Sequence, residues 1–181
     1  MKFREQKIEG VWLIEAEPLV DDRGAFRRHF CHQEFKQMGI EPKILQTNIS
    51  DNYRRHTLRG FHYQVKPFEE AKTLSCMRGA IYNIVVDLRP GSSTFLQWVS
   101  FELKADDGLS LHVPAGCANA YLTREDFTTI LYYMSEAYSA GGYRGFRYND
   151  PLFGFKWPAE PVVISEKDRS YPDFDPGSVK S

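Results

Sequence analysis

Cysteine is scarce in this sequence, and long apolar runs are missing from it. Its three cysteines (Cys31, Cys76 and Cys117) are far apart and form no Cys-x-x-Cys pair, which argues against a disulfide framework or a zinc knuckle. No apolar run approaches the roughly 20 residues of a membrane helix, and residues 1–6 contain no signal-peptide core. The formal net charge of −1 provides no general attraction to nucleic acid or anionic membrane. We therefore expect a cytoplasmic protein without nucleic-acid or membrane partners.

Helical periodicity is also scarce, and only residues 33–38 have the pattern of a helical turn or two, ended by Gly39. Short β-rich runs recur instead, about nine or ten of them, with turn residues between them at the 8–12-residue spacing of a sandwich or barrel. No helix is long enough for a crossover between parallel strands. The pattern predicts an all-β, antiparallel jelly roll with short helical turns, forming a single domain over residues 1–181. The polar segment from Ser165 onward is expected to lie over the barrel or fray.

The segment Thr57–Lys72 combines the residues with the clearest chemical potential. His62 lies in the middle of a strand-like run, and strict alternation would place Arg59 on the opposite face. Gly60 lies between them, and a glycine inside a strand pattern often marks a bulge that redirects one side chain. The pattern therefore allows a shared pocket for Arg59 and His62, and an edge strand with a surface histidine is the simpler alternative.

Two partial motifs resemble those of the cupins, a family of double-stranded β-helix jelly rolls. The segment Gly108-x5-Pro114-x-Gly116-x2-Asn119 has the spacing of the second cupin motif, but metal-binding members have a histidine where Asn119 stands. The first motif requires a His-x-His pair, and His62-Tyr63-Gln64 supplies one histidine. A catalytic metal needs three or more N or O donors. We therefore expect no metal and no cofactor, with a metal-dependent dioxygenase or isomerase as a remote alternative.

Acid–base groups are then the candidates for chemistry. His62 is the only histidine in an apparently buried run, and imidazole suits proton abstraction near neutral pH. Asp168 is a candidate to orient it, and Tyr132 is a candidate proton donor. Tyr138 would share the face of Tyr132 if the chain continued in an extended form. Individually, each of these is more often a packed aromatic or a solvated turn residue.

Eight segments together resemble the dTDP-4-dehydrorhamnose 3,5-epimerase family. They occur in the family's order from about residue 8 to about residue 172, which makes the resemblance specific. The segments are Asp22-Arg23-Gly24-x-Phe26, Gln46-x-Asn48-x-Ser50, Leu58-Arg59-Gly60-x-His62-Tyr63-Gln64, Val86-Asp87-Leu88-Arg89, Ser92-x-Thr94-Phe95, Tyr132-x5-Tyr138, Asp150-Pro151-x2-Gly154-x2-Trp157-Pro158 and Ser165-x-Lys167-Asp168.

The resemblance implies an isomerase that inverts C3, C5 or both in a nucleotide-linked 4-keto-6-deoxyhexose. The ketone at C4 acidifies the neighbouring C–H bonds, so a base forms an enolate and an acid returns a proton to the opposite face. The family pattern makes His62 the base, oriented by Asp168, and Tyr132 the acid. Lys72 would stabilise the enolate oxygen, and Tyr138 would line the same pocket.

The same resemblance implies how the substrate is held. Arg23 and Arg59 match diphosphate-binding arginines, whose forked donors suit phosphate oxygens. Phe26, Gln46 and Asn48 match positions around the nucleotide. Members of the family are homodimers that share strands between subunits.

Two positions depart from the family pattern. Asn119 replaces a histidine near the substrate, and an amide cannot carry charge or move a proton. Arg28 stands where a glutamate commonly contacts the nucleotide, which reverses both charge and donor sense. A single-centre epimerase of a CDP- or GDP-linked sugar is therefore an alternative, and a non-catalytic sugar-binding barrel is a third class.

Overall fold

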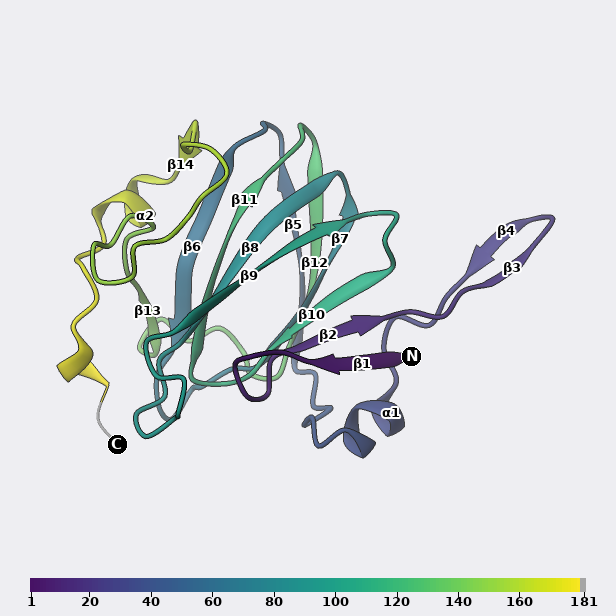
Figure 1. Cartoon of the computed structure of the whole chain (residues 1–181), viewed down its shortest axis with the longest axis horizontal. Coiled ribbons are helices and arrows are strands. Elements are labelled where there is room, and N and C mark those ends of the chain that lie inside the picture. Colours follow the sequence, from purple (N-terminus) through teal and green to yellow (C-terminus); the bar gives the residue numbers. More distant parts are fainter. Residues whose placement is uncertain (180–181) are drawn as a thin grey trace.

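The computed structural model describes residues 1–179, so the last two residues of the domain expected over 1–181 lie outside the described residues. In spatial order, the first sheet contains β1 (Lys2–Glu5), β2 (Trp12–Glu15), β10 (Leu109–Val113), β7 (Lys72–Arg78), β12 (Thr128–Met134) and β5 (Gln46–Asn52). The second contains β13 (Tyr143–Gly145), β6 (Thr57–Gln64), β11 (Cys117–Thr123), β8 (Ala80–Asp87) and β9 (Trp98–Lys104). The two-residue strand β14 (Val163–Ile164) adds to β6 in parallel, and every other pairing in the two sheets is antiparallel. The predicted all-β antiparallel jelly roll is thus confirmed (Figure 1).

Four short elements lie outside these sheets. They are the hairpin of β3 (Leu19–Asp21) and β4 (Gly24–Phe26), the helices α1 (His32–Gln37) and α2 (Glu166–Ser170), and the 3-10 turn η1 (Pro176–Ser178). The predicted helical turns at residues 33–38 match α1, whereas the five residues of α2 are too few to show a helical period. No helix in residues 1–179 has the length and apolarity needed to cross a membrane.

The space between the two sheets is filled by apolar side chains from both. Leu74 and Ile130 of the first sheet and Ile81, Val85 and Tyr121 of the second belong to one buried cluster. In β8 nearly every residue is buried, because its two faces pack into two different apolar clusters. The two sheets therefore share one apolar interior.

A second apolar cluster lies on the outer face of β6, where the C-terminal part of the chain covers the sheet (Figure 1). The ring of Phe61 stacks on those of Phe146 and Phe155, with ring centroids 4.7 and 4.5 Å apart. Because neighbouring residues of a strand point to opposite faces, anchoring Phe61 outside directs His62 into the barrel. Phe174 is buried in the same cluster, so the segment after Ser165 covers the barrel, one of the two outcomes expected from the sequence.

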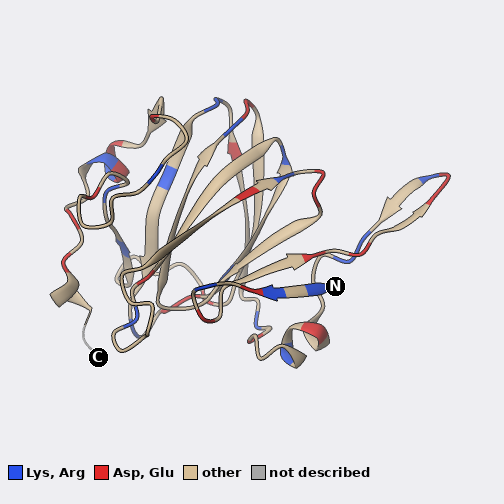
Figure 2. Ribbon diagram, in the orientation of Figure 1, with Lys and Arg blue, Asp and Glu red and all other residues tan. Residues whose placement is uncertain are grey.

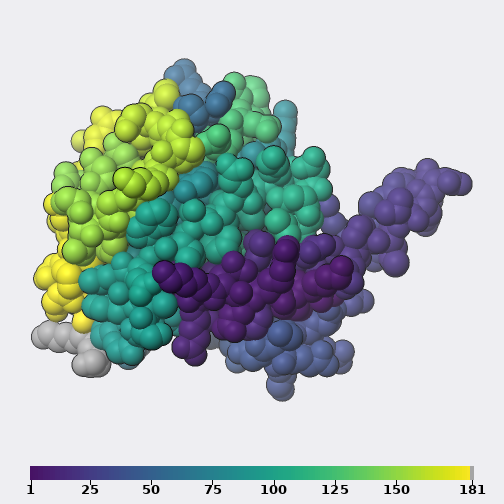
Figure 3. All heavy atoms as spheres, viewed as in Figure 1, coloured from purple at the N-terminus to yellow at the C-terminus, as the bar shows by residue number. Residues whose placement is uncertain are grey.

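The hairpin β3–β4 is the part of the chain that departs most from a compact barrel. It projects away from the sheets (Figures 1 and 3), and Phe26 at its end is 75% exposed. Residues 25–30 have the alternation of a longer strand, but β4 ends at Phe26, and within residues 1–179 it pairs with β3 alone.

Candidate active site

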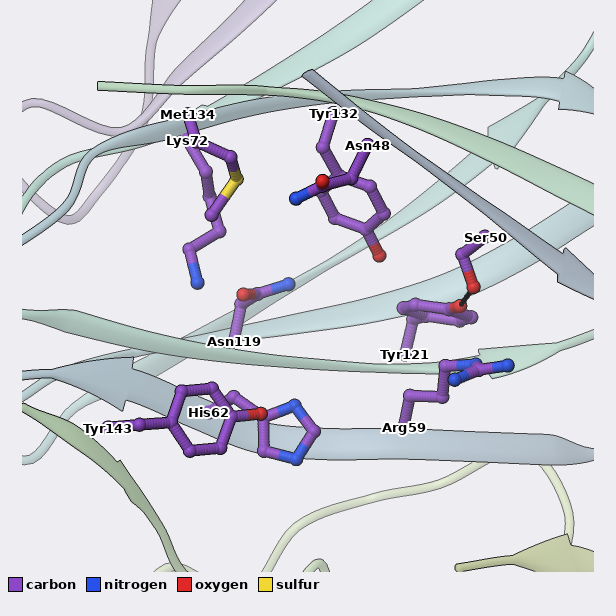
Figure 4. Close-up of a pocket in the computed structure, with 10 residues that line it drawn as sticks. All are labelled: Asn48, Ser50, Arg59, His62, Lys72, Asn119, Tyr121, Tyr132, Met134 and Tyr143. Carbon is purple, nitrogen blue, oxygen red and sulfur yellow. Dashed lines mark hydrogen bonds between the residues drawn. The ribbon is translucent and has the colours of Figure 1, made fainter. Parts of the chain in front are cut away.

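Ten residues from both sheets line a cavity of about 250 Å³ at one end of the barrel. Figure 4 shows two facing walls. The first sheet contributes Asn48, Ser50, Lys72, Tyr132 and Met134, and the second contributes Arg59, His62, Asn119, Tyr121 and Tyr143. Residues far apart in the sequence thus meet in one polar pocket. Basic and acidic positions of both signs are scattered over the whole ribbon (Figure 2), so the cations of this pocket are a local feature.

Gly60 explains how Arg59 and His62 reach the same cavity. Its φ of +117° is a conformation that other residues rarely adopt, and the β6–β11 register shifts beside it, between Asn119 and Tyr121. An added Cβ would lie 2.5 Å from Ala120 Cβ and 2.7 Å from the Asn119 carbonyl oxygen. The irregularity breaks the alternation of side chains along β6. The side chains of Arg59 and His62 therefore both line the cavity, as the position of Gly60 in the sequence allowed.

His62 is held by a carboxylate that lies 106 residues later in the chain. Asp168 Oδ1 is 2.7 Å from His62 Nε2, and Asp168 Oδ2 accepts a hydrogen bond from the Gly60 N–H at 3.2 Å. Ser165 caps α2 by accepting from the Asp168 N–H, which fixes the helix that carries the carboxylate. This is the contact that the sequence predicted.

The charge of Asp168 determines which tautomer His62 adopts. Burial by itself raises the pKa of Asp168, but hydrogen bonding and charge attraction from His62, with the Gly60 N–H, bring this pKa below its usual value. An ionised carboxylate only accepts hydrogen bonds, so His62 Nε2 carries the proton. The lone pair of neutral His62 is then on Nδ1, which faces the cavity in Figure 4.

Lys72 lies on the opposite wall with a partner that the sequence did not reveal. Its Nζ is 2.7 Å from Glu70 Oε1, and both side chains are almost fully buried. A buried ion pair of this kind holds the ammonium group in one place while leaving its other N–H donors for a ligand. Glu70 precedes the strand and shows no sequence pattern that would mark it.

Tyr132 faces His62 across the cavity (Figure 4). Burial, reinforced by the neighbouring Tyr121 phenol, raises the pKa of Tyr132 well above its ordinary value. Burial likewise raises the pKa of Tyr143, with Tyr171 as the next cause. Both phenols therefore remain protonated at neutral pH, and each is a hydrogen-bond donor.

Arg59, Ser50, Tyr121 and Asn119 add further polar groups to the cavity lining. Arg59 Nε donates to Asn52 Oδ1 at 2.8 Å and Nη2 donates to the Asp51 carbonyl at 3.5 Å, which fixes the guanidinium and leaves Nη1 for a ligand. The hydroxyl of Tyr121 lies 2.9 Å from that of Ser50. Asn119 lines the cavity directly opposite His62 in the β6–β11 register. A guanidinium fixed on one edge is suited to bind an anion with the other.

Five of the predicted binding residues do not line this cavity: Arg23, Phe26, Arg28, Tyr138 and Gln46. Arg23 pairs with Asp21 at the tip of the exposed hairpin, at 2.6 Å, and Phe26 is on the same hairpin. Arg28 pairs with Glu34 of α1 at 2.7 Å. Within one chain these residues stay outside the pocket.

Tyr138 is the fourth of them. It follows the end of β12, so it does not share a strand face with Tyr132, and it is 57% exposed. Its ring contacts that of Tyr143 edge-on, with centroids 5.3 Å apart. Tyr138 therefore lies next to a cavity residue at the edge of the pocket. Gln46 is at this edge too, where it donates to Asn48 Oδ1 at 2.9 Å.

Sequence reasoning missed several residues of the site. Tyr121 is two residues after Asn119 in one strand. Because side chains two residues apart share a strand face, period-2 alternation could have predicted that Tyr121 lines the cavity beside Asn119. Tyr143 belongs to a three-residue strand without a sequence pattern, and no signal marked it. His112, which is buried against Thr73, is more buried than His62, so His62 is not the only buried histidine.

The comparisons with known proteins agree with this arrangement. A family model described as dTDP-4-dehydrorhamnose 3,5-epimerase matches residues 5–176. The dTDP-4-dehydrorhamnose 3,5-epimerase of Sinorhizobium fredii is 38% identical over 175 residues, which is 96% of this chain and 90% of that protein. The crystal structure of a protein of the same name from Bacillus anthracis, with TDP and PPi bound, superposes with a TM-score of 0.92. It is 34% identical, and the match covers 96% of this chain and 99% of that one.

A second solved structure broadens the set of similar activities. It is ChmJ, a 3'-monoepimerase from Streptomyces bikiniensis in complex with dTDP-quinovose, which is 33% identical with a TM-score of 0.86. The match covers 93% of this chain and 85% of that one. Because the family model and a 38% identical relative each span nearly the whole sequence, the chain belongs to the dTDP-4-dehydrorhamnose 3,5-epimerase family.

Proposed function

We propose that the protein inverts C3 and C5 of a dTDP-linked 4-keto-6-deoxyhexose, of the type dTDP-4-dehydro-6-deoxyglucose. The single observation that carries this proposal is the His62–Asp168 pair facing Tyr132 across one cavity (Figure 4). His62 Nδ1 takes the proton from the carbon next to the ketone, and the C–H electrons form an enolate. Tyr132 then gives its hydroxyl proton to the opposite face of that carbon, and exchange with solvent restores both groups.

Lys72 is assigned to the enolate oxygen. A preorganised cation at the position where negative charge develops lowers the barrier more than one that must first reorient. The ion pair with Glu70 at 2.7 Å supplies that preorganisation. Arg59 is assigned to the diphosphate, because Asn52 and Asp51 hold its Nε and Nη2 and its Nη1 donors are left for an anion.

We infer that two chains form a homodimer in which each hairpin β3–β4 reaches the cavity of the other. The hairpin exposes Leu19, Val20 and Phe26, each about three-quarters exposed, which is an unusual amount of apolar surface for a free element. Arg23 and Phe26 would thereby contact the nucleotide from the partner. We also place the protein in the cytoplasm, where three free thiols persist without disulfides.

Complementation tests this arrangement. One chain carries His62→Ala with an intact Arg23, and the other carries Arg23→Ala with an intact His62. If Arg23 serves the partner's site, the heterodimer has one complete site, and co-expression restores up to half of the wild-type activity per dimer. If Arg23 serves its own site, co-expression restores nothing.

Solvent-deuterium exchange tests the reaction itself. The purified protein is incubated in D₂O with dTDP-, CDP- and GDP-linked 4-keto-6-deoxy sugars, and deuterium at C3 and C5 is measured by NMR. We expect deuterium at both carbons of the dTDP sugar. The departures at Arg28 and Asn119, together with the likeness to a 3'-monoepimerase, favour exchange at C3 alone as the second candidate. Absence of deuterium from every sugar would refute an epimerase.

A further inference from the structure

Gln64 stands where metal-binding cupins have their second histidine, and its side chain turns away from the cavity. It is 2% exposed, and all three of its hydrogen bonds go to backbone groups. Its Nε2 donates to the Phe68 carbonyl at 2.9 Å and to the Ala137 carbonyl at 3.2 Å. Its Oε1 accepts from the Ser139 N–H at 2.7 Å. The amide therefore joins β6 to the connection between β12 and β13.

The bonded residues flank Tyr138 on both sides. The Tyr138 N–H donates to Gln46 Oε1 at 3.1 Å, so three consecutive residues each have a backbone group held by a glutamine side chain. Tyr138 itself is more than half exposed and is not anchored in the core. The position of its ring therefore depends on these polar bonds.

The same segment connects to the catalytic wall. The Ser139 carbonyl accepts from the Tyr143 N–H at 2.9 Å, which begins β13. The Tyr143 ring lies between two others, 5.3 Å from that of Tyr138 and 5.2 Å from that of His62 by ring centroids. Displacing the segment would shift the edge of the cavity without touching the reacting atoms.

We propose that Gln64 is a positioning residue that holds Tyr138 at the mouth of the cavity, where the phenol ring contacts the bound nucleotide sugar. Gln46 shares this task from the other side of the segment. The role of Tyr138 in this proposal rests on the proposed function. Gln64 does not contact substrate, so its effect is on binding and not on proton transfer.

The test compares Gln64→Leu with the wild type and with Gln97→Leu. Gln97 is a matched control, since its amide also donates to a backbone carbonyl, that of Ser93 at 3.4 Å, outside the cavity. We expect Gln64→Leu to raise KM for the dTDP sugar and Kd for dTDP at least tenfold, with kcat within about threefold of wild type. Gln97→Leu is expected to leave all three constants unchanged.

Hydrogen exchange of the ligand-free protein provides a readout that does not depend on activity. We expect the Tyr138 and Ser139 amides to exchange at least tenfold faster in Gln64→Leu, with the amides of β8 unchanged. If Gln64→Leu does not fold, Gln64→Glu replaces it, because the carboxylate still accepts from Ser139 but loses both donated bonds. We expect Gln64→Glu to raise KM as well.

Two results would overturn the proposal: unchanged exchange at Tyr138 and Ser139, or a fall in kcat with KM and Kd unchanged. A wild-type protein that neither turns over dTDP sugars nor binds dTDP would overturn the proposed function instead. In that case the exchange measurement still decides whether Gln64 holds the segment.

Discussion

Replacing Asp168 by asparagine tests the catalytic assignment most directly, because it changes the charge of the side chain and almost nothing of its shape. Asp168 makes two contacts, with His62 Nε2 at 2.7 Å and with the Gly60 N–H at 3.2 Å. An asparagine keeps one oxygen for the Gly60 N–H, and its NH₂ group then faces the imidazole. That group donates to Nε2, so the imidazole proton moves to Nδ1, on the side of the cavity. The base loses its lone pair where the substrate binds.

We expect kcat of Asp168→Asn to fall about 10³- to 10⁴-fold, the cost of a wrong histidine tautomer in a catalytic triad, or about 4 to 5.5 kcal/mol in activation free energy. KM should change little, since Asp168 does not reach the substrate. The assay is deuterium wash-in at C3 and C5 under saturating substrate.

Stability provides the control for this variant. Because the native environment lowers the pKa of Asp168, its ionised form stabilises the fold above the unfolded pKa of about 4, and this contribution is lost as the pH falls through the folded pKa. Asp168→Asn should therefore lose some stability at pH 7 and melt in a single transition. A folded variant whose kcat stays within tenfold of wild type would refute His62 as a base oriented by Asp168.

Three further changes test other parts of the structure. Gly60→Ala places a Cβ 2.5 Å from Ala120 Cβ at a φ of +117°. Overpacking and backbone strain should together lower the free energy of unfolding, measured by chemical denaturation, by about 2 to 5 kcal/mol. A decrease below about 1 kcal/mol would contradict the close approach. Glu70→Gln leaves the buried ammonium of Lys72 without its carboxylate. We expect the variant to lose about 3 to 5 kcal/mol in stability and to have a lower kcat. An unchanged melting temperature would show that the ion pair is dispensable. Burial lowers the pKa of His112 to about 4, so the unfolded chain binds more protons between pH 6.5 and 4. Stability should fall by about 3 kcal/mol as the pH decreases through that range, and His112→Gln should flatten this slope; an equal slope in the variant would contradict the assignment.

Local sequence patterns were sufficient for the strands and for part of the site. The run at β8 is rich in isoleucine and valine, and predicting it as a strand needed no knowledge of its neighbours. The end of the hairpin could not be predicted in this way, because whether residues 25–30 continue as a strand depends on pairing, and within residues 1–179 β4 pairs with β3 alone.

The motifs and the structure contributed different parts of the site. His62, Lys72 and Tyr132 were found as members of a family pattern, and the structure places them on two facing walls of one cavity. Glu70 and Tyr143 have no motif, and only folding brings them to the site. Tyr143 meets His62 from a distant part of the chain, whereas Glu70 pairs with Lys72 only two residues away, at a spacing that carries no signal of its own.

The sequence by itself determined the fold class and the chemistry of the Thr57–Lys72 segment, because strand period, turn residues and side-chain pKa values are local properties. Only the tertiary structure decided which groups meet. Asp168 reaches His62 across 106 residues because α2 packs on β6, and Arg59 reaches the cavity because Gly60 breaks the strand. Such contacts depend on the closure of the whole barrel, which no single segment specifies.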